Sequence, residues 1–365
     1  MRQSLEFMKA LAPELRLAER RLFNSALRGR MKSNTVLITG AAGFIGSGLA
    51  DRLIADSGDG NTRVILLYHQ SNPLQQPQDR NVIAVRGSMN DYTFMSALIS
   101  RYEINTIYHF ASNSIVRKCA NDPMNAYVTN VMGTVTLLEA VRNAGINTIE
   151  RIVIFTSDKV YGHAVPPYNE DTAFVPKYTY ESTKACQDIV AQNYLHNYML
   201  PINIVRSSNV FGPGDPNLTR IIPNAIRSIR RGEKPIIFTG VKDYIREFVY
   251  IDDVVDGLFL INRSAAKGEV YCIGGTETIS IEGLVNKICQ LMDYRGGVAV
   301  VDKPGNFQEI REQSIDSSKL RAVGWRPKFS LEQGLQACID SVGYGAPGNA
   351  ATVLAKRGAT IAPTT

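Results

Sequence analysis

Short runs of apolar residues alternate along this chain with longer segments in which apolar residues recur every three or four positions. The short runs predict buried strands over residues 35–39, 64–67, 82–85, 106–109, 152–155 and 202–205. The longer segments predict helices over 49–54, 92–101 and 123–145, and a further helix that contains Tyr180. Strands that alternate with helices of this length need crossover connections, which are typical of a parallel sheet covered on both faces. The pattern therefore predicts an α/β fold with a Rossmann-type doubly wound parallel sheet.

The pattern changes after about Ser207. A loop rich in Gly and Pro comes first. Helices are predicted over 220–231 and 252–261 and after Ser280 and Ser330, and one strand is predicted over 244–250. These mixed pieces predict a smaller mixed α/β C-terminal lobe that closes over the carboxyl edge of the sheet. We expect four parts: a basic leader, helical or frayed (1–33), a dinucleotide-binding Rossmann domain (34–206), a substrate-binding lobe mixed with late Rossmann elements (207–343) and a disordered tail (344–365).

The first predicted strand leads directly into a glycine-rich turn with the spacing G-x-x-G-x-x-G, formed by Gly40, Gly43 and Gly46. Glycines allow a tight turn and a close approach of the backbone, and the helix that follows offers free N–H groups to a pyrophosphate. Strand, turn and helix together predict a dinucleotide site. The second strand ends in Tyr68-His69-Gln70, without the acidic residue that usually binds the ribose of NAD, so the choice between NAD and NADP stays open.

A second segment with candidate catalytic residues runs from Thr156 to Lys184. Tyr180 and Lys184 have the spacing Y-x-x-x-K, which places a phenol and an ammonium on one face of a helix. Ser157-Asp158-Lys159 directly follow a buried strand, at the sheet edge where open α/β folds bind ligands. These residues predict an acid/base site. The same sequence could also occur as an accidental Y-x-x-x-K on a surface helix and a solvated ion pair in a loop.

Composition and charge exclude several other classes of protein. The 365 residues are 44% hydrophobic and 20% charged, with a net charge of +6, and residues 1–32 carry eight Lys/Arg and three Glu. Since this leader holds almost all of the excess charge, we expect no nucleic-acid-binding face. No apolar run approaches a membrane span, and the five scattered cysteines are typical of a reduced cytoplasmic protein. Four histidines without paired spacing predict no metal site.

Several motifs together resemble one family. In chain order they are T-G-A-A-G-F-I-G, H-F-A-S-N, T-N-V-M-G-T, T-S-D-K-V-Y-G, Y-x-x-x-K, S-N-V-F-G-P-G-D, R-E-F-V-Y-I-D-D and G-W-R-P. As a set, from Asn34 to Gly343, they resemble the extended short-chain dehydrogenases that act on nucleotide sugars. S-D-K and R-I-I-P-N-A-I-R look most like the CDP-glucose 4,6-dehydratase branch. The resemblance implies tightly bound NAD, with NADP not excluded, a nucleotide-diphosphate sugar as substrate, and a homodimer.

The resemblance also implies a 4,6-dehydratase reaction: oxidation at C4, loss of water across C5–C6, and return of the hydride to C6. Tyr180 would be the base at C4, with its pKa lowered by Lys184, and Ser157 would bind the C4 oxygen. Asp158 would be the acid at C6. Lys159 would be the base at C5, which requires that burial or a cation such as Lys184 lowers its pKa.

Ligand contacts follow from the same resemblance and from residue chemistry. The residues expected to hold the cofactor are Gly40, Gly43, Phe44, Ile45, Gly46, Ala111 and Lys184. Those expected to bind the substrate are Asn113, which could instead fix its loop, and Asn209, Arg220 and Arg246 at the diphosphate.

Three rival functions stay open. A 4-epimerase on the same fold needs Tyr180, Lys184 and Ser157, but no base at C5 and no acid at C6. A decarboxylase acting on a uronic acid is a variant of the same chemistry. A non-catalytic NAD(P)-binding protein would not need the Tyr180/Lys184 pair at all.

Overall fold

The computed structural model describes residues 34–56, 62–69, 81–145, 148–263, 265–302 and 309–341. The predicted leader (1–33) and tail (344–365) lie outside the described residues. None of the helices in these ranges is both long enough and apolar enough to cross a membrane.

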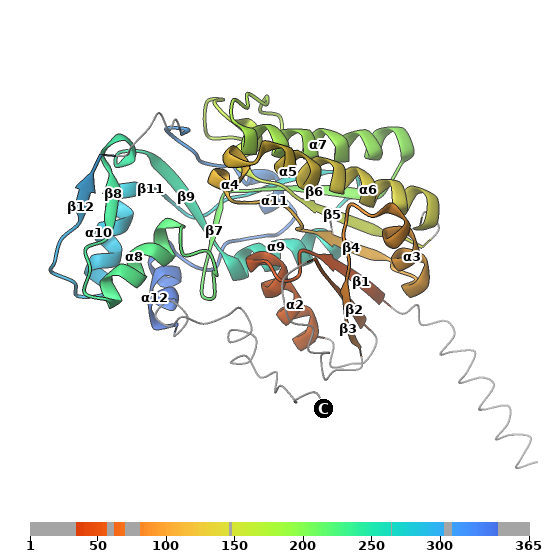
Figure 1. The fold of residues 1–365 in the computed structure, drawn as a ribbon, viewed down its shortest axis with the longest axis horizontal. Helices are drawn as coiled ribbons and strands as arrows, with labels where there is room; N and C mark the ends of the chain where they lie inside the picture. Colours follow the sequence, from red (N-terminus) through yellow and green to blue (C-terminus); the bar gives the residue numbers. More distant parts are fainter. Residues whose placement is uncertain are drawn as a thin grey trace, which may run out of the picture. The chain divides into compact units, whose positions relative to one another are not determined.

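The principal sheet has seven strands in the order β10-β6-β5-β4-β1-β2-β3 (Figure 1). Parallel pairing joins β10 to β6, β6 to β5, β5 to β4, β4 to β1, and β2 to β3. The strands are β1 (Asn34–Thr39), β2 (Thr62–Tyr68), β3 (Val82–Arg86), β4 (Thr106–His109), β5 (Arg151–Phe155), β6 (Ile202–Ser207) and β10 (Val270–Ile273). The doubly wound parallel sheet is therefore confirmed, and β10 is a seventh strand that the apolar pattern did not predict.

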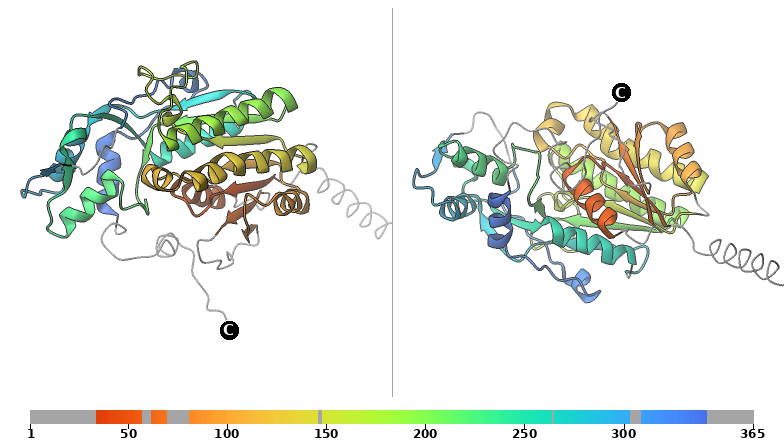
Figure 2. Two further views of the ribbon diagram at one scale, coloured as in Figure 1. Left: turned by 45° about the horizontal axis from the view of Figure 1, so that its top comes forward. Right: turned by 90° about the horizontal axis from the view of Figure 1, so that it is seen from below.

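Successive strand residues point to opposite faces of the sheet, and helices cover both faces (Figure 2). Ile38 and Val153 belong to a core with α2 (Phe44–Asp56) and α9 (Ile251–Arg263). Leu37 and Ile152 belong to a second core on the other face. The helices packed there are α3 (Tyr92–Tyr102), α6 (Gly133–Ala140) and α7 (Thr179–Tyr198). This alternation explains why the strands read as continuous apolar runs.

The helix predicted from Pro123 to Gly145 is present with those ends, but it is not a uniform α-helix. It consists of α5 (Pro123–Tyr127), the π-helical turn η1 (Val128–Met132), α6, and a second π-helical turn η2 (Val141–Gly145). The first π turn holds Asn130, which is fully buried. A π turn at this place is notable because such turns often accompany functional sites.

The chain beyond β6 adds two smaller sheets. One has the order β11 (Thr278–Ser280)-β9 (Ile245–Tyr250)-β7 (Asn209–Phe211), and the other pairs β8 (Ile236–Phe238) with β12 (Ala299–Val301). The helices in this part are α8 (Ile221–Arg230), α10 (Ile281–Leu291), α11 (Ser318–Ala322) and α12 (Leu331–Asp340). The predicted caps are confirmed, because Ser280 and Ser330 each accept a hydrogen bond from a backbone N–H of the first helical turn.

Candidate active site

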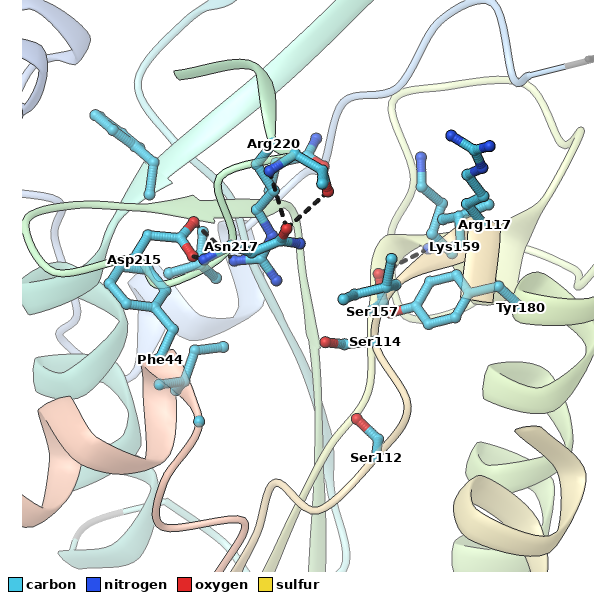
Figure 3. A pocket seen from close by; sticks show the side chains of 18 of the residues that line it. Phe44, Ser112, Ser114, Arg117, Ser157, Lys159, Tyr180, Asp215, Asn217 and Arg220 are labelled. Carbon is cyan, nitrogen blue, oxygen red and sulfur yellow. Dashed lines mark hydrogen bonds and ion pairs between the residues drawn. The ribbon is translucent and has the colours of Figure 1, made fainter. Parts of the chain in front are cut away.

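A cleft of about 1620 Å³ lies at the carboxyl edge of the principal sheet. It is larger than the pockets of up to about 1,000 Å³ that hold one small ligand, so it has room for two ligands side by side. Figure 3 shows Lys159 and Tyr180 on one side of it and Arg220 and Asp215 on the other. The sequence-predicted residues that line it are Gly40, Gly43, Phe44, Ile45, Gly46, Ala111, Ser157, Lys159, Tyr180, Lys184, Asn209, Arg220 and Arg246. Asp158 and Asn113 are predicted site residues that do not line it.

The glycine-rich turn lies where the strand order reverses, between β1 and β4. Gly40 has a φ of +70°, and a Cβ there would lie 2.7 Å from the backbone nitrogen of Ala111. A Cβ on Gly46 would lie 2.4 Å from the carbonyl oxygen of Gly40. The turn is therefore as tight as the spacing predicted, and it leads into the N-terminus of α2 beside the cleft.

A buried chain of hydrogen bonds connects this turn to Lys184. His109 lies between two hydroxyls, with Nδ1 2.7 Å from Thr39 Oγ1 and Nε2 3.0 Å from Thr134 Oγ1. Gln187 donates to the same Thr134 oxygen at 3.1 Å and accepts from Lys184 Nζ at 2.8 Å. Burial lowers the pKa of His109 to about 3, so its ring is neutral.

The directions of these hydrogen bonds can be assigned. Thr39 Oγ1 already accepts from the N–H of Ala111, and Thr134 Oγ1 donates to the carbonyl of Asn130. The hydroxyl of Thr39 is thus free to donate to Nδ1 of His109, while Nε2–H donates to Thr134. Every member of the chain is satisfied in this arrangement, which fixes Lys184 relative to the glycine turn.

Tyr180 is buried and forms a hydrogen bond with Ser157. Burial raises the pKa of Tyr180, the charge of Asp158 raises it further, and Arg220 and the bond with Ser157 lower it. The expectation that Lys184 lowers this pKa is wrong for the arrangement seen. The ammonium of Lys184 is directed to Gln187 and to the carbonyl of Phe155 instead, and burial lowers its own pKa to about 8.

Ser157, Asp158 and Lys159 form the junction between β5 and the short helix η3 (Asp158–Tyr161). Ser157 caps η3 by accepting from the N–H of Lys159, and its hydroxyl donates to Asp158 Oδ1 at 2.9 Å. The other carboxylate oxygen of Asp158 accepts from Gln313 Nε2 at 3.1 Å, and Lys159 Nζ donates to Gln313 Oε1. The acid therefore lies behind the cleft wall, whereas the amine is part of that wall.

The condition set for Lys159 is met, although by a different cation. Burial lowers the pKa of Lys159, and the positive charge of Arg246 lowers it too, while Asp158 raises it. An amine with a lowered pKa can act as a proton acceptor near neutral pH.

Asn113 does not line the cleft, and the hydrogen bonds of its backbone hold its loop in place instead. Its backbone N–H donates to Asn130 Oδ1 at 2.6 Å, and its carbonyl accepts from Asn130 Nδ2 at 3.2 Å. Asn130 also donates to Thr183 on α7, so the π turn ties this loop to the catalytic helix.

The residues expected at the diphosphate all line the cleft, but each already has a protein partner. Asn209 Nδ2 donates to the carbonyl of Glu247 at 3.0 Å. Arg220 pairs with Asp215 at 3.0 Å, and Arg246 pairs with Glu309 at 3.1 Å.

Sequence reasoning missed Gln187, Asp215, Glu309 and Gln313. Two of them carry a local signal: Gln187 lies three residues after Lys184 on the same helix, and Asp215 ends the motif S-N-V-F-G-P-G-D five residues before Arg220. In the ranges that the structure describes, no group of three His, Cys, Asp or Glu residues is placed so that it could hold a metal ion.

One family model and several characterised proteins are similar to most of this chain. The family model described as GDP-mannose 4,6 dehydratase matches residues 37–338. The low-salt glycan biosynthesis protein Agl12 of Haloferax volcanii is 32% identical over 317 residues, which cover 84% of this chain and 97% of that protein. The dTDP-glucose 4,6-dehydratase 1 of Escherichia coli is 28% identical over 336 residues, covering 84% of this chain and 91% of that protein.

Solved structures of both dehydratases and epimerases share the fold. The dTDP-glucose 4,6-dehydratase of Bacillus anthracis in complex with NAD has a TM-score of 0.74 at 27% identity, covering 84% of this chain and 95% of that one. The UDP-glucose 4-epimerase of Thermotoga maritima with UDP-glucose has a TM-score of 0.76 at 27% identity, covering 84% and 97%. The fold alone does not separate the two reactions.

Proposed function

Since the chain belongs to the GDP-mannose 4,6 dehydratase family, we propose that it catalyses 4,6-dehydration of a nucleotide-diphosphate sugar with tightly bound NAD. At the coarser level it is an NAD-dependent enzyme of the nucleotide-sugar dehydratase and epimerase group. The observation that carries the finer proposal is Lys159, an amine of lowered pKa in the cleft wall, next to the carboxyl group of Asp158. An epimerase needs no such pair.

The cleft fits a dinucleotide. The turn at Gly40 and Gly46 leaves no space for a Cβ, so the backbone can approach a pyrophosphate closely, and the N-terminus of α2 favours negative charge there. Lys184, held by Gln187, would hydrogen-bond the nicotinamide ribose. NAD, when bound, supplies a cationic hydride acceptor that takes the hydrogen from C4 and gives it back at C6.

Tyr180 and Ser157 would serve the oxidation. Tyr180 takes the proton of the C4 hydroxyl, and Ser157, hydrogen-bonded to Tyr180, orients the C4 oxygen. Burial raises the pKa of Tyr180, so the phenolate needs cationic neighbours; Arg220 already lowers this pKa from the opposite wall.

Lys159 and Asp158 would serve the elimination. Once C4 is a ketone, the C5 proton is acidic, and the neutral amine of Lys159 removes it. Asp158 protonates the hydroxyl that leaves from C6. Because Asp158 lies just behind the wall, hydrogen-bonded to Ser157, a small rotation of its side chain or transfer through Ser157 would deliver the proton.

We propose that residues 207–343, apart from α9 and β10, which belong to the principal sheet and its covering helices, form the substrate lobe, and that Asn209, Arg220 and Arg246 bind the diphosphate. Their position in the cleft wall supports this assignment, with Arg220 and Arg246 exchanging their carboxylate partners for phosphate oxygens. A cytoplasmic homodimer is proposed from the family resemblance. The preferred nucleotide is left for experiment.

A 4-epimerase is the second candidate. The burial of Asp158 behind the wall favours it, because an epimerase has no use for an acid at C6. The similarity to the Thermotoga epimerase is of the same size as that to the dehydratases.

One assay separates the two. Purified protein is incubated in turn with CDP-, dTDP-, GDP- and UDP-hexoses, and the products are identified by mass spectrometry and NMR. Loss of one water with a C4 ketone and a C6 methyl group is the expected result. An unchanged mass with inverted C4 would contradict dehydration and support epimerisation.

A further inference from the structure

Gln313 is the only fully buried glutamine besides Gln187 in the described part of the chain, and it touches both members of the proposed acid/base pair. Its amide nitrogen donates to Asp158 Oδ2 at 3.1 Å, and its amide oxygen accepts from Lys159 Nζ. Asp158 and Lys159 are separated from Gln313 by more than 150 residues of sequence. The amide is therefore placed between acid and base by the fold.

The segment that carries Gln313, residues 309–317, is anchored on several sides. The N–H of Gln313 donates to the carbonyl of Ile245 at 3.1 Å, and Ile245 N–H donates to the carbonyl of Arg311 at 3.0 Å. The N–H of Ile315 donates to the carboxylate of Glu247 at 2.9 Å. Because its backbone is held to β9 in this way, the amide of Gln313 has little freedom to turn.

An acid and an amine that are neighbours in a buried site tend to pair with each other as carboxylate and ammonium. Such a pair would leave Lys159 protonated and Asp158 ionised, which are the wrong states for a base and an acid. A carboxamide does not titrate, and it can accept an N–H with its oxygen while it donates with its nitrogen. Gln313 thus satisfies both partners and makes a direct ion pair unnecessary.

The direction of the amide matters for the reaction. In the elimination, the proton of C5 moves to the nitrogen of Lys159, and the electrons of the C5–H bond form the C5=C6 double bond. The C6–O bond breaks, and the leaving hydroxyl takes a proton from Asp158 and departs as water. The step adds a proton to Lys159 and removes one from Asp158, so positive charge develops on the amine and negative charge on the carboxyl group. The oxygen of Gln313 faces the new cation and its N–H faces the new anion.

We propose that Gln313 is a positioning residue for the elimination: its fixed amide dipole holds Lys159 and Asp158 and stabilises the charges that form on them. Preorganised dipoles aimed at developing charge are among the strongest catalytic devices of proteins. The inference rests on the proposed dehydratase function and goes beyond it, because it assigns a role to a segment outside every motif of the sequence.

Other charged groups around Lys159 also influence its pKa and therefore the pH dependence of the reaction. Asp158, Glu309 and Glu181 raise the pKa of Lys159, and Arg246 lowers it. Glu309 is paired with Arg246, and Glu181 accepts from the N–H groups of residues 177 and 178 at the start of α7. Gln313 differs from all of these because it touches both Lys159 and Asp158 with hydrogen bonds and carries no charge.

Two substitutions test the proposal in the full-length chain with NAD bound. Gln313→Met keeps the approximate volume and removes both hydrogen bonds. Gln313→Glu places a carboxylate against Lys159, and this negative charge raises the pKa of the amine. Gln336→Glu, the same change at an exposed residue of α12, is the matched control. The measurements are the rate of water loss against pH, exchange of the C5 hydrogen with D₂O, and reduced nicotinamide formed on adding substrate.

We expect Gln313→Met to slow water loss and C5 exchange at least about tenfold while reduced nicotinamide still forms, which also shows that the variant is folded. In Gln313→Glu the acidic limb of the rate profile should move to higher pH, and Gln336→Glu should match the wild type. Wild-type rates and an unmoved pH profile in both variants would overturn the inference alone. If the wild-type chain eliminates no water from any of the sugars, the proposed function and this inference fall together.

Discussion

The two halves of the active site are built in different ways. The proposed oxidising half, with Tyr180, Lys184 and the glycine turn, is held by elements that all belong to the principal sheet and its helices. The eliminating half begins at the end of β5 with Asp158 and Lys159 but is completed by Gln313 from a segment that pairs with β9. Motifs name the main residues of both halves, but only the fold reveals Gln313, which joins Asp158 and Lys159.

The largest effect is expected from a substitution of Lys159, which should stop the loss of water without stopping the oxidation. Lys159→Ala removes the proposed base at C5, so water loss should fall by roughly 10²–10⁴-fold, the usual contribution of a general base. Reduction of the cofactor by substrate should persist, because Tyr180 and Lys184 are untouched. Product mass and nicotinamide absorbance measure the two separately, and Lys234→Ala, at an exposed lysine, is the control. Full turnover in Lys159→Ala would show that the two halves are not distinct.

A substitution at the glycine turn should instead abolish both halves together. In Gly46→Ala the new Cβ would lie 2.4 Å from a backbone oxygen of Gly40, so the turn must open. We expect at least a tenfold loss of NAD bound per chain, measured by heat release and mass spectrometry, with loss of all turnover. Gly240→Ala is a suitable control, because no atom lies within 4 Å of a Cβ there. Retained NAD and activity would place the cofactor elsewhere.

A pH effect on stability should report on the eliminating half. Burial raises the pKa of Glu247, which anchors Ile315, from 4.5 to about 7. The folded state therefore binds this proton more tightly than the unfolded state. Its contribution to the free energy of unfolding, on the order of 3 kcal/mol, is present in full below pH 4.5 and is lost as the pH rises through 7.

Denaturant unfolding at several pH values tests whether the free energy of unfolding falls as the pH rises. Stability of the wild type should decline between pH 5 and pH 8 from this group, and Glu247→Gln should flatten that decline. Glu277→Gln, at an exposed residue, should leave the slope as it is. An equal slope in Glu247→Gln and wild type would mean that Glu247 is not the group that titrates.

The smallest effect should appear in the oxidising half at Gln187. Gln187→Glu puts a carboxylate 2.8 Å from the ammonium of Lys184, whose pKa burial lowers to about 8. We expect formation of reduced nicotinamide in the wild type to fall above about pH 8, and the new charge should raise the pKa of Lys184 so that this formation continues to higher pH. About a tenfold difference at the alkaline end is expected, with the acidic limb of water loss unchanged. A shift in water loss alone would contradict the division into halves.

Much of this organisation could be predicted from sequence because its causes are local. The apolar runs predicted six strands of the principal sheet, and the glycine turn and Y-x-x-x-K predicted residues that do line the cleft. The seventh strand, β10, was missed because it lies beyond Ser207, where the regular alternation of strand and helix ends and the pattern placed the chain in the smaller lobe.

The remaining errors have the same physical origin. The direction of the Lys184 ammonium depends on Gln187 and Thr134, which no spacing rule connects. The burial of Asp158 depends on Gln313, and the amide of Asn130 determines that Asn113 turns away from the cleft wall. Contacts between distant segments decide these details, and a pattern along the chain does not record them.

The attachment of residues 309–317 to β9 has a consequence for protein engineering. The backbone of this segment is hydrogen-bonded both to β9 and, through Ser314 and Asp316, to Tyr168, so a segment grafted from a relative would have to keep both sets of bonds. Grafts of this kind would alter what becomes of the keto-sugar while leaving its formation intact, and so convert one scaffold into a set of enzymes with different end products.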